Sequence, residues 1–123
     1  MATSALRDRR ILVVEDEYLI AMTLADALQN AGSIVVGPVP SVDGAIEKIE
    51  SEPLIDAAVL DVNLGGALVY AVADMLLARK IPFVFTSGYE DDILRRRYPQ
   101  IRNCHKPYLF PKMEEALTSA MSR

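Results

Sequence analysis

Short apolar runs alternate along the chain with segments of helical period. The runs cover residues 10–14, 33–39, 56–61, 81–87 and, most weakly, 101–105. Apolar residues recur every three to four positions in the segments that follow, at 17–31, 41–52, 67–80, 93–97 and from Pro111 onward. Five strand-then-helix units in succession predict an α/β fold, a (βα)5 arrangement in which helices cover both faces of a five-stranded parallel sheet.

Two of the runs have features of edge strands. Pro38 and Pro40 lie in or next to the second run, and proline cannot donate a hydrogen bond to a neighbouring strand. The fifth run carries the polar residues Arg102, Asn103 and His105, which suit the other edge. We therefore expect the doubly wound strand order 2-1-3-4-5 rather than a dinucleotide-binding order.

Length, charge and cysteine content exclude several classes of protein. With 123 residues the chain fits one domain, which we expect at 10–123 after a flexible segment at 1–9. A net charge of −4 argues against a nucleic-acid partner, and no apolar run approaches the ~20 residues that a membrane span needs. The single cysteine, Cys104, allows neither an intrachain disulfide nor a thiolate metal cluster. We expect a cytoplasmic protein with no membrane partner.

Charged and hydroxyl residues stand where the strands end. In chain order they are Glu15 and Asp16, Asp61, Thr86 and Ser87, and Lys106. The carboxyl ends of parallel strands meet at one edge of the sheet, where open α/β folds bind their ligands. Three carboxylates, a pair of hydroxyls and one ammonium group are therefore expected to converge there.

Such a set favours a divalent cation. Two carboxylates ~4 Å apart repel each other by roughly 4 kcal/mol at an effective dielectric constant near 20, and one lysine cannot neutralise three of them. Oxygen ligands alone select a hard ion, and a few carboxylates completed by water fit Mg²⁺ better than Ca²⁺. A carboxylate beside Mg²⁺, a lysine and a hydroxyl is equipped to take a phosphoryl group as an acyl phosphate, and Asp61 is the candidate nucleophile.

Four short motifs resemble those of the receiver domain of two-component response regulators. They are Val-Val-Glu-Asp at 13–16, Leu-Asp at 60–61, Phe-Thr-Ser-Gly at 85–88 and Lys-Pro at 106–107. Their order is that of the family, each ends an expected strand, and together they cover nearly the whole chain. The stretch 82–89 is also similar to a stand-alone subgroup whose fourth strand reads Phe-Ala-Thr-Gly-Tyr. The resemblance implies a flavodoxin-like receiver fold and a phosphoprotein of two-component signal transduction.

The family pattern assigns a role to each acid and to the lysine. It implies that Asp61 is the phosphoacceptor and that Glu15 and Asp16 bind Mg²⁺ together with it. The backbone carbonyl of Asn63 becomes a further metal ligand, and Lys106 contacts the phosphoryl group.

The hydroxyl role falls on Ser87. Counting back from Gly88 and forward from Pro82 places the family's Thr/Ser position there, whereas strand alternation points Thr86 to the opposite face. A purely structural alternative is that Ser87 caps the helix that follows.

Two departures from the family pattern concern the loop after Asp61 and the output. Residues 63–66 lack the usual Pro and Asp-Gly, which leaves the conformation of this loop open. Asn103 stands three positions before the lysine, where many receivers carry a switch aromatic. We therefore expect Tyr89 to follow the movement of Ser87 and to reposition the arginines of the fourth helix, Arg95, Arg96 and Arg97.

These expectations define a single-domain response regulator that acts as a switch and not as a turnover enzyme. A sensor histidine kinase or histidine phosphotransfer protein would supply the phosphoryl group. Output would run to a downstream protein target or a phosphorelay through the fourth helix, fifth strand and fifth helix, a face that would also serve a homodimer. One alternative is a small phosphohydrolase with an aspartyl nucleophile, although Asn63 stands where such enzymes need a second acid. The other is a non-phosphorylated interaction module, against which only the complete set of acids and lysine argues.

Overall fold

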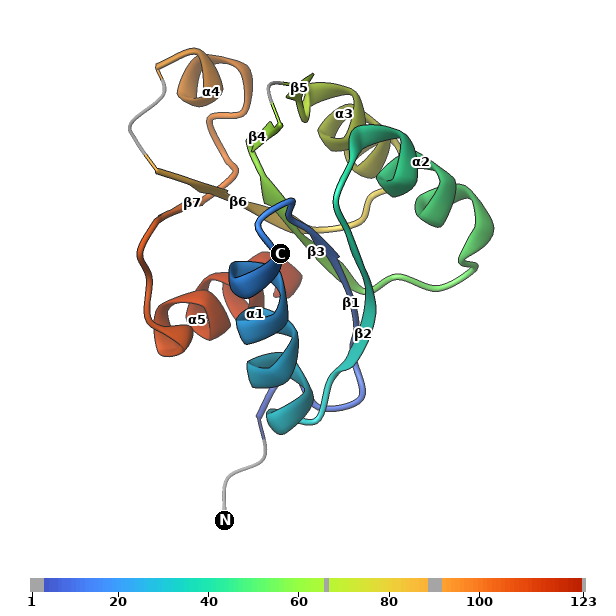
Figure 1. Cartoon of the computed structure of the whole chain (residues 1–123), viewed down its shortest axis with the longest axis vertical. Coiled ribbons are helices and arrows are strands. Elements are labelled where there is room, and N and C mark those ends of the chain that lie inside the picture. The colour runs from blue at the N-terminus through green and yellow to red at the C-terminus, as the bar shows by residue number, and fades with distance from the viewer. Residues whose placement is uncertain (1–3, 66, 89–91, 123) are drawn as a thin grey trace.

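The computed structural model describes residues 4–65, 67–88 and 92–122, which form a parallel sheet between two layers of helices (Figure 1). The sheet consists of β1 (Arg10–Val14), β2 (Ile34–Val39), β3 (Ala57–Asp61), β6 (Phe83–Ser87) and β7 (Asn103–His105). Its strands lie in the order β2-β1-β3-β6-β7 and all pair in parallel. Counted over these five strands the order is 2-1-3-4-5, so the expected fold, order and edge strands are confirmed. Four of these strands, all but β1, begin one or two residues later than expected.

The helices divide between the two faces of the sheet (Figure 1). One face is covered by α1 (Tyr18–Asn30) and α5 (Phe110–Met121), the other by α2 (Val42–Ser51), α3 (Tyr70–Ala78) and α4 (Asp92–Arg97). β3 is buried along its whole length because both faces of the sheet are covered there. Among the described residues, no helix has the length and apolar character needed to cross a membrane.

Local sequence signals account for the ends of several elements. The hydroxyl oxygen of Ser41 accepts a hydrogen bond from the backbone N–H of Gly44 at 3.0 Å, which caps α2 as expected. Gly32 follows α1 with a φ of 92°, a backbone conformation that glycine adopts without strain. Pro111 lies in the first turn of α5, where its missing N–H costs no helical hydrogen bond.

The segment after Asp61 differs from the expected one. It forms a two-stranded antiparallel ribbon, β4 (Asn63–Leu64) and β5 (Ala67–Leu68), so that α3 begins at Tyr70 and not near residue 67. Gly65 supplies the turn with a φ of 59°. The pairing of the ribbon withholds residues 67 and 68 from the helix, although their apolar spacing fits a helical period.

The segment before β1 packs onto the domain. Leu6 is fully buried among side chains of α1 and α5, and its carbonyl accepts a hydrogen bond from the hydroxyl of Ser33 at 2.7 Å. The hydroxyl of Ser4 donates to Glu114 on α5 at 2.6 Å. Residues 4–9 thus lie against the domain, while the expected flexibility of 1–9 and the boundary at residue 10 stay predictions.

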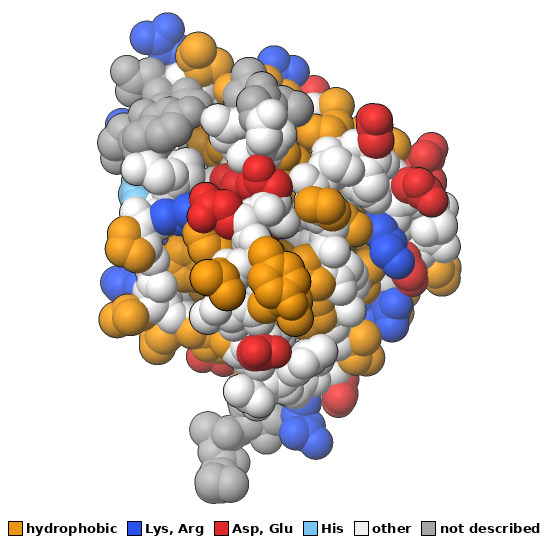
Figure 2. Space-filling model, viewed as in Figure 1, with side chains coloured by type: hydrophobic (Ala, Val, Ile, Leu, Met, Phe, Trp, Pro, Cys, Tyr) orange, Lys and Arg blue, Asp and Glu red, His pale blue; other side chains and the backbone are white. Residues whose placement is uncertain are grey.

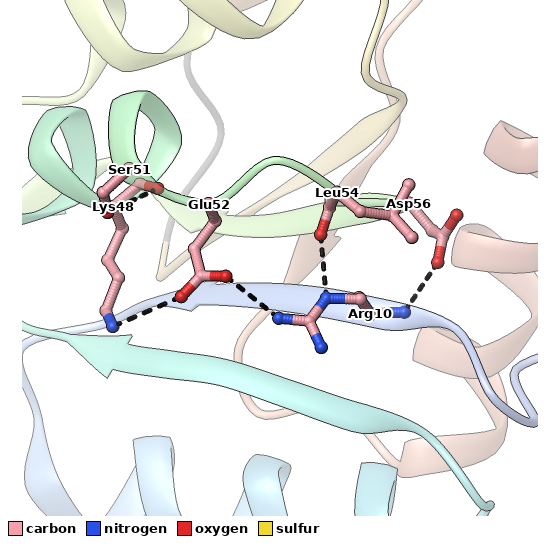
Figure 3. Close-up of polar contacts among 6 residues, drawn as sticks. All are labelled: Arg10, Lys48, Ser51, Glu52, Leu54 and Asp56. Carbon is pink, nitrogen blue, oxygen red and sulfur yellow. Dashed lines mark hydrogen bonds and ion pairs between the residues drawn. The ribbon is translucent and has the colours of Figure 1, made fainter.

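Arg10 ties the start of β1 to the connection between α2 and β3 (Figure 3). Its backbone N–H donates to Asp56 Oδ2 at 2.8 Å, its Nε to the carbonyl of Leu54 at 2.9 Å, and its Nη2 to Glu52 Oε2 at 3.0 Å. Lys48 lies 3.8 Å from the other oxygen of Glu52. These contacts join the amino-terminal ends of β1 and β3, which pair in parallel and so end at the same edge of the sheet.

Candidate functional site

Three carboxylates meet at the carboxyl edge of the sheet. Val14 of β1 pairs with Leu60 of β3, which places the next residues of the two strands, Glu15 and Asp61, side by side. Both are 5% exposed, whereas Asp16 is exposed. One carboxylate oxygen from each of the three lies within 4.8 Å of the others. The predicted convergence of these acids is present in the structure.

Lys106 follows β7 and reaches two of these acids. Its Nζ lies 2.8 Å from Glu15 Oε1 and 3.3 Å from Asp61 Oδ2. Its backbone N–H donates to the carbonyl of Ser87 at 2.7 Å, which continues the pairing of β6 with β7. The sheet therefore sets the place of the ammonium group as well as that of the acids.

The site holds more negative charge than its lysine balances. Burial, followed by the hydrogen bond with Glu15 and the charge of that residue, raises the pKa of Asp61 to about 7, and the nearby Lys106 lowers it only in part. For Lys106, burial lowers the pKa, but the two carboxylates outweigh it and the net shift is upward. Asp61 is thus a carboxyl group whose charged form needs a further cation.

A cavity of about 320 Å³ opens beside these side chains. It is lined by Asp16, Glu17, Asp61, Asn63, Gly65, Gly88 and Lys106. Oxygen atoms are the only metal donors among the clustered acids, a set that fits a hard divalent cation. Asn63 lies at the cavity as expected, and the use of its carbonyl as a ligand stays a prediction.

Ser87 ends β6 and is 3% exposed. Its hydroxyl oxygen accepts a hydrogen bond from the side-chain Nδ2 of Asn103 on β7 at 2.8 Å. The adjacent Gly88 lines the cavity. Sequence reasoning singled out both Ser87 and Asn103 but missed the bond between them, because it depends on the register of two strands.

The structure describes some of the predicted output residues. Tyr89, the expected partner of Ser87, is outside the described residues. On α4, Arg95, Arg96 and Arg97 are exposed. Arg97 pairs with Asp74 of α3 at 3.0 Å, so this arginine has a structural contact within the domain.

Tyr98, directly after α4, is a buried aromatic residue that sequence reasoning missed. It is 4% exposed, and its ring lies 5.3 Å from that of Phe85 on β6. Its hydroxyl donates to Asp74 Oδ1 at 2.7 Å. Burial, then the bond with Asp74, raises the pKa of Tyr98 to about 12, and the same bond, aided by Arg97, lowers the pKa of Asp74. Three arginines precede Tyr98 and a proline follows it, a pattern typical of an exposed helix end. The sequence therefore did not indicate that Tyr98 is buried.

An apolar cleft of about 490 Å³ lies next to the acids, between α1 and residues 106–110. Ile20 and Leu24 form one wall, and Tyr108 and Phe110 form the other. Burial, followed by the negative charge of Glu15, raises the pKa of the Tyr108 hydroxyl. Figure 2 shows the acidic side chains gathered above a group of exposed hydrophobic side chains over α1. On α1, Tyr18 is 74% exposed and Leu19 is 77% exposed.

A parallel sheet in this order, with acids and a lysine at its carboxyl edge, defines a receiver-type α/β domain. No protein-family model matches the chain. SdrG from Sphingomonas melonis Fr1 is 40% identical, each chain covers all of the other, and the TM-score is 0.81. A structure of the BeF3-activated conformation of SdrG from Pseudomonas melonis Fr1 is 44% identical over 87% of this chain and 91% of that one, with a TM-score of 0.73. A response regulator receiver protein from Sinorhizobium medicae WSM419 is 26% identical over 96% and 98% of the two chains, with a TM-score of 0.82.

Among curated proteins, the phyllosphere-induced regulator PhyR of Methylorubrum extorquens is 33% identical over 93 residues. The match covers 73% of this chain and 34% of PhyR, so the chain spans about a third of the length of that relative. The chain belongs to the response regulator receiver domain family, as its motifs predicted. Members of this family are phosphorylation-dependent signalling switches.

Proposed function

We propose that Asp61 accepts a phosphoryl group and that this chain thereby acts as the receiver of a two-component system. The observation that carries the proposal is the position of its Oδ2, 3.3 Å from the ammonium of Lys106 in a buried site. Phosphoryl transfer needs a positioned nucleophile and positive charge on the oxygens of the transferred group. Asp61 supplies the nucleophile, Lys106 supplies the positive charge, and the two groups are in contact.

The phosphoryl donor would be a phosphohistidine of a sensor kinase or a phosphotransfer protein. A carboxylate oxygen of Asp61 forms a bond to phosphorus as the bond from phosphorus to the imidazole nitrogen breaks. The imidazole leaves with the electron pair of that bond and takes up a proton, and the product is an acyl phosphate. Lys106 holds an oxygen of the group, and the burial of Asp61 limits the access of water to the new bond.

Glu15, Asp16 and Asp61, with the backbone carbonyl of Asn63, would hold Mg²⁺ in this protein. Two observations support that assignment: the three carboxylate oxygens lie within 4.8 Å of one another, and the pKa of Asp61 is raised to about 7. When bound, Mg²⁺ neutralises the carboxylates and the phosphoryl oxygens. The fourth charged group, Lys106, then acts beside the metal and not in place of it.

The donor protein would dock over α1. The imidazole has to reach Asp61, and the exposed apolar side chains of Tyr18 and Leu19 lie on the helix that follows Glu15 and Asp16. To test this, a sensor kinase that labels wild type is also offered Leu19→Gln, and the two rates of phosphoryl transfer are compared. We expect slower transfer from the kinase at an unchanged rate from acetyl phosphate. Equal rates from the kinase would place the donor elsewhere.

The output surface remains the one predicted from sequence. We assign it to α4, β7 and α5, where Arg95 and Arg96 are exposed and could contact a downstream protein or a second copy of this chain. Arg97 on the same helix pairs with Asp74 of α3.

The decisive experiment is the mass of the protein after incubation with Mg²⁺ and acetyl phosphate. Wild type should gain one phosphoryl group, and Asp61→Asn should gain none. Asp26→Asn, which alters an exposed aspartate of α1 outside the site, is the matched control and should gain one. Continuous release of phosphate without a stable adduct would favour a phosphohydrolase. A protein that neither gains mass nor releases phosphate would be an interaction module.

A further inference from the structure

The hydroxyl of Ser87 is held from the neighbouring strand by an amide group. The register of β6 and β7 pairs Phe85 with Asn103 and Ser87 with His105. The bond from Asn103 Nδ2 to Ser87 Oγ, at 2.8 Å, therefore runs diagonally between the strands. Because Ser87 is 3% exposed, water competes little for this contact.

The other polar atom of the same amide has no partner among the described residues. Asn103 Oδ1 is buried and accepts no hydrogen bond there, an arrangement that costs free energy in a folded protein. An amide turned the other way would let Oδ1 accept the proton of the Ser87 hydroxyl. The orientation present instead makes the hydroxyl an acceptor toward Asn103.

We propose that Asn103 is a positioning residue, which holds the Ser87 hydroxyl so that its proton is directed to the phosphoryl group on Asp61. This inference rests on the proposed function. A serine hydroxyl has one proton and two acceptor lone pairs. Asn103 takes up a lone pair and does not compete for the proton, and a charged phosphoryl oxygen is a stronger acceptor than a neutral one.

The same strand positions the lysine of the site. The backbone N–H of Lys106 donates to the carbonyl of Ser87 at 2.7 Å, while its ammonium lies 3.3 Å from Asp61 Oδ2. Residues of β7 and its immediate continuation thus hold Ser87 at its side chain and at its backbone. An aromatic residue at position 103 would lack the amide N–H that makes this bond, so this chain has an amide contact where many receivers have a ring.

The test is a cycle of four proteins: wild type, Asn103→Leu, Ser87→Ala and the double variant. Each is incubated with Mg²⁺ and acetyl phosphate, and the rate of gain of the phosphoryl mass is followed. We expect Asn103→Leu to slow the gain about tenfold when Ser87 is present and to add no slowing in the Ser87→Ala background. A role in folding alone would slow both backgrounds equally.

Two further variants sharpen the result. Asn103→Asp keeps the shape of the side chain but replaces the donor with an acceptor. It should therefore slow the gain of mass more strongly in the protein with Ser87 than in the Ser87→Ala background. Arg102→Gln is the control on the same segment; its side chain pairs with Glu115 of α5 at 3.3 Å, and its rate should equal that of wild type. If Asn103→Leu does not fold, the cycle with Asn103→Asp decides.

Slowing by Asn103→Leu that is the same in both backgrounds, or absent from both, would overturn the role of Asn103 while leaving Asp61 as acceptor. Failure of wild type itself to gain mass on Asp61 would overturn the proposed function, and the inference with it. Whether wild type gains mass therefore distinguishes failure of the proposed function from failure of the role of Asn103.

Discussion

The hydroxyl of Tyr98 donates to the carboxylate of Asp74 across 2.7 Å and joins the end of α4 to α3. The guanidinium of Arg97 binds the other oxygen of Asp74 at 3.0 Å and lies 4.8 Å from the ring centre of Tyr70. Phe85 connects this cluster to the strand that ends in Ser87, because its ring contacts that of Tyr98. Strand β6 is therefore in direct contact with the residue that follows α4 through two buried rings.

Removal of the Tyr98 hydroxyl tests this junction. Tyr98→Phe keeps the ring against Phe85 but removes a hydrogen bond to a charged group, so we expect a loss of about 1–2 kcal/mol in the free energy of unfolding. Urea denaturation measures it. Tyr18→Phe, at a residue that is 74% exposed, is the control and should change nothing. A Tyr98→Phe variant as stable as wild type would mean that water replaces the bond without loss.

Metal-free protein should lose stability as the pH rises from about 4 to about 7. The pKa of Asp61 is near 7 in the folded chain and near 3.8 when unfolded, so between these values the folded state binds the extra proton. The free energy of unfolding then falls by at most about 1.4 kcal/mol per pH unit, and this contribution levels off above pH 7. Thermal melts in EDTA measure the slope. Asp61→Asn should flatten it, and an equally steep slope in that variant would assign the proton to another group.

Magnesium should stabilise the unphosphorylated protein. At a concentration one hundred times its dissociation constant, a cation that binds only the folded state contributes about 2.7 kcal/mol. Asp16→Ala should remove most of that gain, because Asp16 supplies the exposed member of the acid cluster. Melting curves with and without Mg²⁺ measure it, with Asp26→Ala as the control. An unchanged gain in Asp16→Ala would mean that the metal binds elsewhere.

Leu6 should contribute to stability although it precedes the first strand. Its side chain is fully buried, so Leu6→Ala leaves a cavity and should cost roughly 2–5 kcal/mol. Leu109→Ala, at a side chain that is 77% exposed, is the matched control and should stay within about 0.5 kcal/mol of wild type. Equal stability of the two variants would support a flexible segment up to residue 9.

The sequence predicted most of the sheet and much of the site, for physical reasons. Parallel strands covered on both faces are nearly all apolar, so a charge such as that of Asp61 marks where one ends. Because those ends share one edge, the meeting of Asp61 with Glu15, Asp16 and Lys106 followed from strand order alone.

The contacts that the sequence did not reveal depend on register or on competition between structures. The bond from Asn103 to Ser87 requires the offset between β6 and β7, which no single run encodes. The apolar spacing around Ala67 fits a helix, but the turn at Gly65 lets Ala67 pair with Leu64 instead. Tyr98 follows a run of charged residues, a pattern typical of an exposed segment. Its burial depends on packing against Phe85, a residue on another element.

The buried position of Tyr98 also gives the protein an optical signal of its own. The chain contains five tyrosines and no tryptophan, so tyrosine dominates its near-ultraviolet absorption and its emission. Tyr98 differs from the exposed Tyr18 because its hydroxyl is bonded to a carboxylate and its ring lies against other rings. A rearrangement of α4 that breaks this contact changes the spectrum of the unlabelled protein, and the difference between wild type and Tyr98→Phe isolates that change.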